Sequence, residues 1–272
     1  MKIKIIFLYF YLFIFAQQLI WGQEDRLFYD AVRAEASGDL DLAIRLYLEA
    51  SKLSHSTNLH GNLANLYFKK EQFGHAILHF RKALLLQPKN SELSANLEFA
   101  YEMAKIPRSS NNFVNTYLSP DFMSFWIIIS TVIFWGGLLF FLYFLFFKTN
   151  KKPLFYFVLM WTPLGILTFY PTVLSLNQQA ELNQEVVTHL PSIENNNSRS
   201  ISLRRFAGAQ SSANTTIIPG ESLIINLAKD GNNKTHQSSN GKTWYLARSK
   251  DGKKKGWLRE DEFGWIVDHT KN

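Results

Sequence analysis

The sequence predicts a multidomain membrane protein: α-helical repeats, then a two-helix transmembrane hairpin, then a C-terminal all-β barrel. Three observations predict this fold class. A helical pattern recurs at an offset of 33 residues, two uncharged runs of more than 20 residues follow, and the apolar pattern then changes to the alternation of strands. A length of 272 residues is enough for two small domains beside the membrane segment.

Residues 1–22 have the form of a secretory signal peptide. Lys2 and Lys4 precede the apolar stretch Ile5–Ala16, and Gly22 is a small residue suited to a cleavage point. An uncleaved anchor helix is the alternative interpretation. Both interpretations export the residues that follow.

Residues 23–105 contain an internal repeat, in which segments 38–53 and 71–86 align. The paired positions are Leu40/Phe73, Ala43/Ala76, Ile44/Ile77, Tyr47/Phe80 and Ala50/Ala83. Their spacing places each set on one face of a helix. Pro88 ends the second helix of the pair, and residues 91–105 are expected to form a closing helix.

This A-x3-F/Y-x2-A pattern with a period near 34 resembles tetratricopeptide repeats. His55 departs from that pattern, because a helix-ending proline is usual there. The resemblance implies that the first helix of each pair lines a concave groove that accepts a peptide or a helix. The groove candidates are Phe28, Val32, Asn58, Asn62, Asn65, Phe68, Lys69, Phe99 and Met103.

Residues 122–147 and 154–176 are expected to be transmembrane helices, since neither contains a charged residue. At 1.5 Å per residue, each spans roughly 30–35 Å, enough for the hydrocarbon layer. The loop 148–153 carries three lysines, which places it in the cytoplasm by the positive-inside rule. The chain on both sides would then lie in the periplasm, with the hairpin in the inner membrane. A hydrophobic hairpin inside a soluble core is the alternative.

Two polar segments flank this hairpin. Residues 106–121 have turn formers and no apolar period, so we expect a linker. Residues 177–200 are expected to be a second linker, with Val186–Thr188 as a possible first strand and residues 193–200 as an insertion.

Residues 201–268 alternate between apolar and polar side chains. Strands are expected at 202–204, 222–227, 243–247, 256–258 and 263–266. The order of Leu203-Arg204, Pro219-Gly220-Glu221, the Trp244 strand, Asp251-Gly252 and Gly256-Trp257 resembles a bacterial SH3 domain. By this resemblance the ligand candidates are Trp244, Tyr245 and Trp257, although the same aromatics also serve as core in such barrels.

The whole arrangement of signal peptide, repeats, membrane hairpin and SH3-like domain resembles the BatE proteins of the Bacteroides aerotolerance operon. That resemblance implies a membrane-anchored adaptor that works beside von Willebrand A-domain membrane proteins and a MoxR-type ATPase. We therefore expect a non-enzymatic scaffold in an envelope complex. The alternative is a module that binds or senses peptidoglycan, since bacterial SH3 domains often contact the cell wall.

Several chemistries lack support in the sequence. The absence of cysteine rules out disulfides, thiolate metal sites and a thiol nucleophile. No G-x-S-x-G, S-x-x-K or glycine-rich phosphate loop occurs, so we expect no enzyme. His75 and His79 have a metal-binding spacing but no acidic third ligand nearby in sequence. We expect both to be solvent-facing, and we expect no metal and no cofactor.

The formal net charge of +7 permits a nucleic-acid partner by composition alone. No nucleic-acid motif accompanies it, and an exported chain meets anionic lipid and polymer instead. We therefore expect the lipid bilayer and envelope proteins as partners, with peptidoglycan as the alternative, and no nucleic acid.

Alkaline phosphatase fused after residue 110 and after residue 272 should be active in both cases. The reason is that both points lie outside the cytoplasm if the lysine loop lies inside it. Phosphatase activity in whole cells measures this, with a fusion inside the loop as the inactive control. A silent fusion at either of the first two points would contradict the topology.

Overall fold

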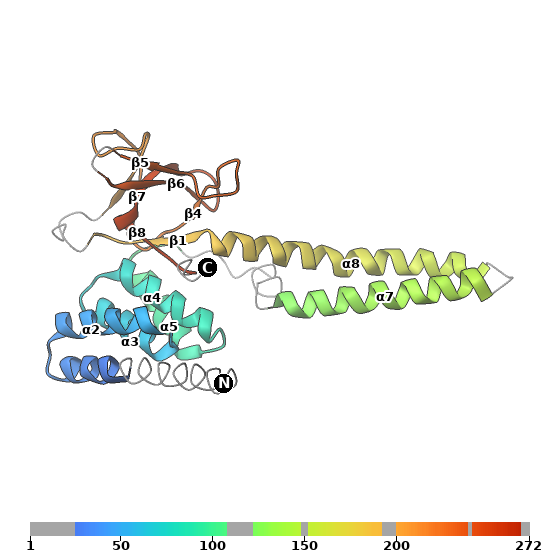
Figure 1. Cartoon of the computed structure of the whole chain (residues 1–272), viewed down its shortest axis with the longest axis horizontal. Helices are drawn as coiled ribbons and strands as arrows, with labels where there is room; N and C mark the ends of the chain where they lie inside the picture. Colours follow the sequence, from blue (N-terminus) through green and yellow to red (C-terminus); the bar gives the residue numbers. More distant parts are fainter. Residues whose placement is uncertain (1–24, 108–121, 148–151, 192–199, 239–240, 268–272) are drawn as a thin grey trace, which may run out of the picture. The chain divides into compact units, whose positions relative to one another are not determined.

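The structure is a computed structural model that describes residues 25–107, 122–147, 152–191, 200–238 and 241–267 (Figure 1). It divides into two compact units, residues 1–107 with 185–272, and residues 108–184. The expected signal peptide, nearly all of the first linker and insertion, and most of the lysine loop lie outside the described residues.

The first unit begins with helical repeats. Residues 25–36 are helical, followed by α2 (Leu40–Leu53), α3 (Thr57–Lys69), α4 (Phe73–Leu86) and α5 (Ser91–Met103). Three of these helices begin at a side chain that accepts a hydrogen bond from the backbone N–H three residues on, namely Asp39, Ser56 and Asn90. Helix α4 ends two residues before Pro88, as the sequence predicts.

The buried face of the repeats matches the predicted register. Of the paired positions, Ala43, Tyr47, Ala50, Ala76, Ile77 and Ala83 are all fully buried. Phe80 is 1% exposed and Ile44 is 8% exposed. The helical repeat predicted from these residues is therefore confirmed.

The second unit contains two helices, α7 (Met123–Phe147) and α8 (Lys152–Asn183), each long and apolar enough to cross a membrane. A Cβ atom at Gly137 would lie 1.9 Å from Nε1 of Trp161, so glycine lets this ring pack against α7. That Nε1–H donates to the carbonyl of Ile133 at 3.1 Å. The hydroxyls of Ser130 and Thr172 form a second contact at 2.7 Å.

Helix α8 continues through residues 177–183, where the sequence analysis placed a linker. This segment, NQQAELN, contains good helix formers and no proline or glycine, so the helix continues past the apolar run. Strand β1 then begins at Glu185, after a single residue. The expected linker of residues 177–200 is therefore shorter than predicted at its beginning.

The C-terminal part of the first unit is an antiparallel sheet. Its strands are β1 (Glu185–Thr188), β2 (Ile201–Arg204), β3 (Ala213–Ile217), β4 (Ser222–Ile225), β5 (Thr235–Gln237), β6 (Thr243–Ser249), β7 (Lys255–Arg259) and β8 (Phe263–Trp265). Their order is β3-β2-β7-β6-β4-β1-β8, and β5 pairs with β6. The core includes Val186, Leu203, Ile217, Leu223, Ile225, Leu258 and Phe263.

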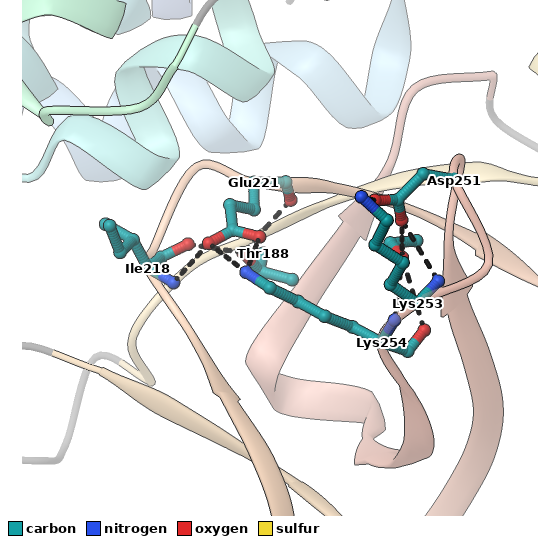
Figure 2. A network of polar contacts seen from close by, with 7 residues as sticks. Thr188, Ile218, Glu221, Asp251, Lys253 and Lys254 are labelled. Carbon is teal, nitrogen blue, oxygen red and sulfur yellow. Dashed lines mark hydrogen bonds and ion pairs between the residues drawn. The ribbon is translucent and has the colours of Figure 1, made fainter.

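The Pro219-Gly220 motif forms a tight turn between β3 and β4. The carbonyl of Ile218 accepts from the backbone N–H of Glu221 at 3.0 Å, and Gly220 has a φ of +102°, which glycine adopts without strain. Figure 2 shows the Glu221 carboxylate accepting from the backbone N–H of Ile218 at 3.0 Å and from Nζ of Lys254 at 2.8 Å. These bonds fix the turn in one conformation.

Candidate protein-binding groove

The groove candidates on α3 and α5 form an accessible aromatic patch. The ring centroids of Phe68 and Phe99 are 5.3 Å apart, and Phe68 also lies 5.5 Å from Phe73. Phe99 is 52% exposed and Met103 is 47% exposed, although both are large apolar side chains. Since water contact with such residues is unfavourable, this patch is a candidate surface for a partner.

Other groove candidates support the interior of the repeat. The side-chain amide of Asn62 donates to the hydroxyl of Tyr47 at 2.9 Å, and the Phe28 ring meets the Tyr47 ring edge at 5.4 Å. Burial raises the pKa of this tyrosine, so its hydroxyl stays neutral. Asn58 and Asn65 are exposed and Val32 is 40% exposed.

Lys69 is already paired within the repeat. Its Nζ lies 2.7 Å from a carboxylate oxygen of Glu35, which joins the first helix to α3. Because the lysine side chain is 54% exposed, this pair contributes little to stability, about 0–1 kcal/mol. A partner carboxylate that approached Lys69 would have to compete with Glu35.

The outer face of α4 packs against the sheet, at β1 and the turns beside it (Figure 1). Three glycines make this approach possible. A Cβ at Gly74 would lie 2.7 Å from the carbonyl oxygen of Thr188, one at Gly220 would lie 2.7 Å from Cδ1 of Ile77, and one at Gly264 would lie 2.3 Å from Cδ2 of Leu78. Because glycine has no Cβ atom, α4 and the sheet can pack closely at each of these positions.

An ion pair between a partly buried arginine and a buried glutamate lies in the same contact. One guanidinium nitrogen of Arg81 on α4 lies 2.6 Å from Glu185 on β1 and donates to the hydroxyl of Ser222 at 2.6 Å. The ammonium of Lys250 lies 3.1 Å from the second Glu185 oxygen. Burial opposes ionisation of Glu185, but these two cations lower its pKa to about 2. The carboxylate is therefore charged at neutral pH.

The histidines of α4 are not solvent-facing, and the expectation that they would be is wrong. His79 is 6% exposed, and its Nδ1 lies 3.3 Å from Nδ1 of His60. His75 stacks on His189, which follows β1, with ring centroids 4.0 Å apart. His79 packs against His60 and Tyr67 within the repeat, whereas the sheet covers His75. Within the described residues, no group of three or more His, Cys, Asp or Glu side chains is placed to hold a metal ion.

The three aromatic candidates of the sheet do not share one surface. The Trp244 ring is 1% exposed, and the guanidinium carbon of Arg204 lies 5.6 Å from its centroid. Tyr245 points to the opposite side, where its ring meets Phe263 at 5.2 Å. Trp257 is partly exposed. A ligand therefore meets Trp257 more readily than Trp244, which lies in the interior.

The comparison with known families agrees with the helical part of this description. A family model described as Tetratricopeptide repeat matches residues 58–90, which include most of α3 and all of α4. No curated protein matches the chain. The matched segment contains the groove candidates Asn58, Asn62, Asn65, Phe68 and Lys69, and it also contains the face of α4 that packs on the sheet.

Substituting Gly74 by alanine should destabilise the protein. Alanine favours helix over glycine by about 1 kcal/mol. The added Cβ would nevertheless lie 2.7 Å from the carbonyl oxygen of Thr188, so we expect a net loss of about 1–3 kcal/mol. Chemical denaturation of the full chain measures this. Gly208→Ala is the control, because its Cβ would meet nothing within 4 Å. Equal or higher stability of the Gly74→Ala variant would contradict the described contact.

Proposed function

We propose that this chain is a non-enzymatic scaffold, anchored in the inner membrane by α7 and α8, whose repeat groove binds a protein partner. One observation carries the proposal. Phe99 and Met103 remain about half exposed on the groove side, while the outer face of α4 is covered by the sheet. The face that tetratricopeptide repeats use for binding is the face that this fold leaves open.

The chemistry of the patch favours an apolar helix or peptide as the bound element. Aromatic side chains contribute large contact areas to interfaces, and methionine adapts its shape to the partner. Within this patch, the Phe68 ring packs against the Phe99 ring, with centroids 5.3 Å apart. The exposed amides of Asn58 and Asn65 supply hydrogen-bonding groups for a partner backbone.

The membrane arrangement follows from the lysines between the two apolar helices. We propose that the loop lies in the cytoplasm and that the repeats and the sheet lie in the periplasm. We also propose that the sheet is an SH3-like barrel of the bacterial type. Its support is the order of the Arg204 strand, the Pro219-Gly220 turn, the Trp244 strand and the Asp251-Gly252 turn.

The order of these parts resembles the BatE proteins, and we propose the same class of partner. These partners would be von Willebrand A-domain membrane proteins that work with a MoxR-type ATPase in an aerotolerance or stress-related envelope complex. Such membrane proteins share the bilayer with α7 and α8, which raises the local concentration of both binding surfaces. A contact of modest affinity is then sufficient.

The double substitution Phe99→Glu with Met103→Glu should reduce recovery of such a von Willebrand A-domain partner about tenfold, equivalent to about 1.4 kcal/mol. The reason is that two buried carboxylates would replace apolar contacts at the centre of the interface. Co-purification from detergent-solubilised membranes measures the effect.

The matched control is Phe206→Glu, which changes a phenylalanine that is 68% exposed on the sheet side. It should leave recovery unchanged. Equal recovery with the groove variant and with wild type would contradict binding in the groove. An equal loss of partner recovery with the groove variant and with Phe206→Glu would show that the loss is not specific to the groove.

A further inference from the structure

Two histidine rings lie face to face in the contact between α4 and the sheet. The rings of His75 and His189 are 25° from parallel. Nε2 of His75 lies 3.2 Å from the carbonyl oxygen of Leu190, and Nδ1 of His189 lies 3.3 Å from the same oxygen. A carbonyl accepts only from a nitrogen that carries hydrogen, so each neutral ring has its proton at that nitrogen.

This stack is the end of a longer row of rings. Tyr67 stacks on His75 at 4.6 Å and on His79 at 5.5 Å. His79 then stacks on His60 at 5.4 Å, and His60 on His55 at 5.6 Å. Those four contacts lie within the repeat. Among the described contacts of the row, the His75–His189 stack is the one that joins the helices to the sheet.

The groups around the two rings keep them neutral while they are packed. Burial lowers the pKa of His75 to about 3, and His189 contributes to this shift against the Leu190 carbonyl. Burial also lowers the pKa of His189, against the carbonyls of Leu190 and Phe263 and the nearby Asp261 carboxylate.

The remaining titratable neighbours act on the repeat side or through the backbone. The hydroxyl of Tyr67 stays protonated because burial raises its pKa to about 12. Burial lowers the pKa of His79 well below its ordinary value, and His60, Lys82, His75 and His189 lower it further. The backbone carbonyl of Glu262 accepts from the backbone N–H of His189 at 2.9 Å, so this contact does not involve the imidazole ring.

We propose that the His75–His189 stack is a proton-operated release, in which protonation of both rings separates the repeat helices from the sheet while each part keeps its fold. Two imidazolium rings with centroids 4.0 Å apart repel each other. A charged ring also loses hydration in this contact and regains it when the two parts separate. The release is independent of which partner occupies the groove.

The direction of the pH effect follows from the two states of the rings. Separated rings regain the ordinary histidine pKa of 6.5, whereas docking lowers the pKa of His75 to about 3 and also lowers the pKa of His189. Docking is therefore fully favoured above about pH 6.5 and is weakened as the pH falls. His75 therefore shifts the equilibrium toward separation by about tenfold per pH unit between about pH 6.5 and 4.5, and protonation of His189 shifts it in the same direction.

The ion pair between Arg81 and Glu185 does not titrate in this window. The carboxylate has a pKa of about 2 in the folded protein and 4.5 ordinarily, so its contribution is lost only below about pH 4.5. A release between about pH 6.5 and 4.5 is therefore assigned to histidine and not to Glu185.

A distance measurement on the full chain in detergent tests the proposal. The protein has no cysteine, so Lys52→Cys and Thr216→Cys introduce two spin labels at exposed positions, one on α2 and one on β3. Electron paramagnetic resonance should show a longer and broader distance distribution as the pH falls from 7.5 to 4.5. The change should reverse at pH 7.5, and circular dichroism should show the helices retained.

Substitutions that keep a ring but remove its titration identify the groups responsible. The opening equilibrium should depend on two protons in the wild type, on one in His189→Phe, and on none in the double variant His75→Phe with His189→Phe. His236→Phe is the matched control, since this exposed histidine lies on β5 and should leave the pH dependence unchanged.

Three results would overturn the proposal. The first is a wild-type distance between the spin labels that stays unchanged at pH 4.5. The second is a double variant that opens at the same pH as the wild type. The third is a loss of the helical circular dichroism signal in the same step as the opening. If the double variant does not dock at pH 7.5, the single variant His189→Phe provides the test. If opening of His189→Phe still depended on two protons, as in the wild type, the proposal would equally be overturned.

Discussion

The buried pair of Arg81 and Glu185 is the interaction on which the first unit depends. It joins the second helix of a repeat to the strand that begins one residue after α8. A buried charge without its partner costs several kcal/mol, so each side chain is stable in this place only if the other is present. The glycines at 74, 220 and 264 let the two backbones approach closely enough for the pair to form. Repeat and sheet are therefore one packed unit, not two modules on flexible linkers.

This docking also separates the two faces of the repeat by role. The outer face of α4 is occupied by the sheet, whereas the patch of Phe68, Phe99 and Met103 remains accessible. A partner in the groove would thus bind to repeat helices whose opposite side is packed against the sheet. In the chain, the single residue Gln184 separates α8 from β1. The proposed histidine release would uncover the outer face of α4.

Patterns of burial explain what the sequence predicted. The helical repeat and strands β1, β2, β4, β6, β7 and β8 each contain buried apolar side chains, and each was predictable within a few residues. Strand β5 is exposed throughout and β3 is buried only at Ile217, so neither has an apolar alternation. The docking face was missed because it has no periodic signal. An alignment of the two repeats does reveal this face. The first repeat has exposed side chains at Asp41, Leu42 and Arg45, and the second repeat has Gly74, His75 and Leu78 at the same positions.

The central claim is that repeat and sheet are coupled through Arg81 and Glu185. A double-mutant cycle with Arg81→Met, Glu185→Leu and both together tests it most directly, with the free energy of unfolding of the full chain as the measurement. We expect Glu185→Leu to lose about 3–5 kcal/mol, because it leaves the Arg81 charge without its carboxylate partner. Arg81→Met should lose less, because Lys250 still pairs with Glu185. The double variant should recover part of that loss, with a coupling energy on the order of 1–3 kcal/mol. Additive losses in the double variant would contradict the claim.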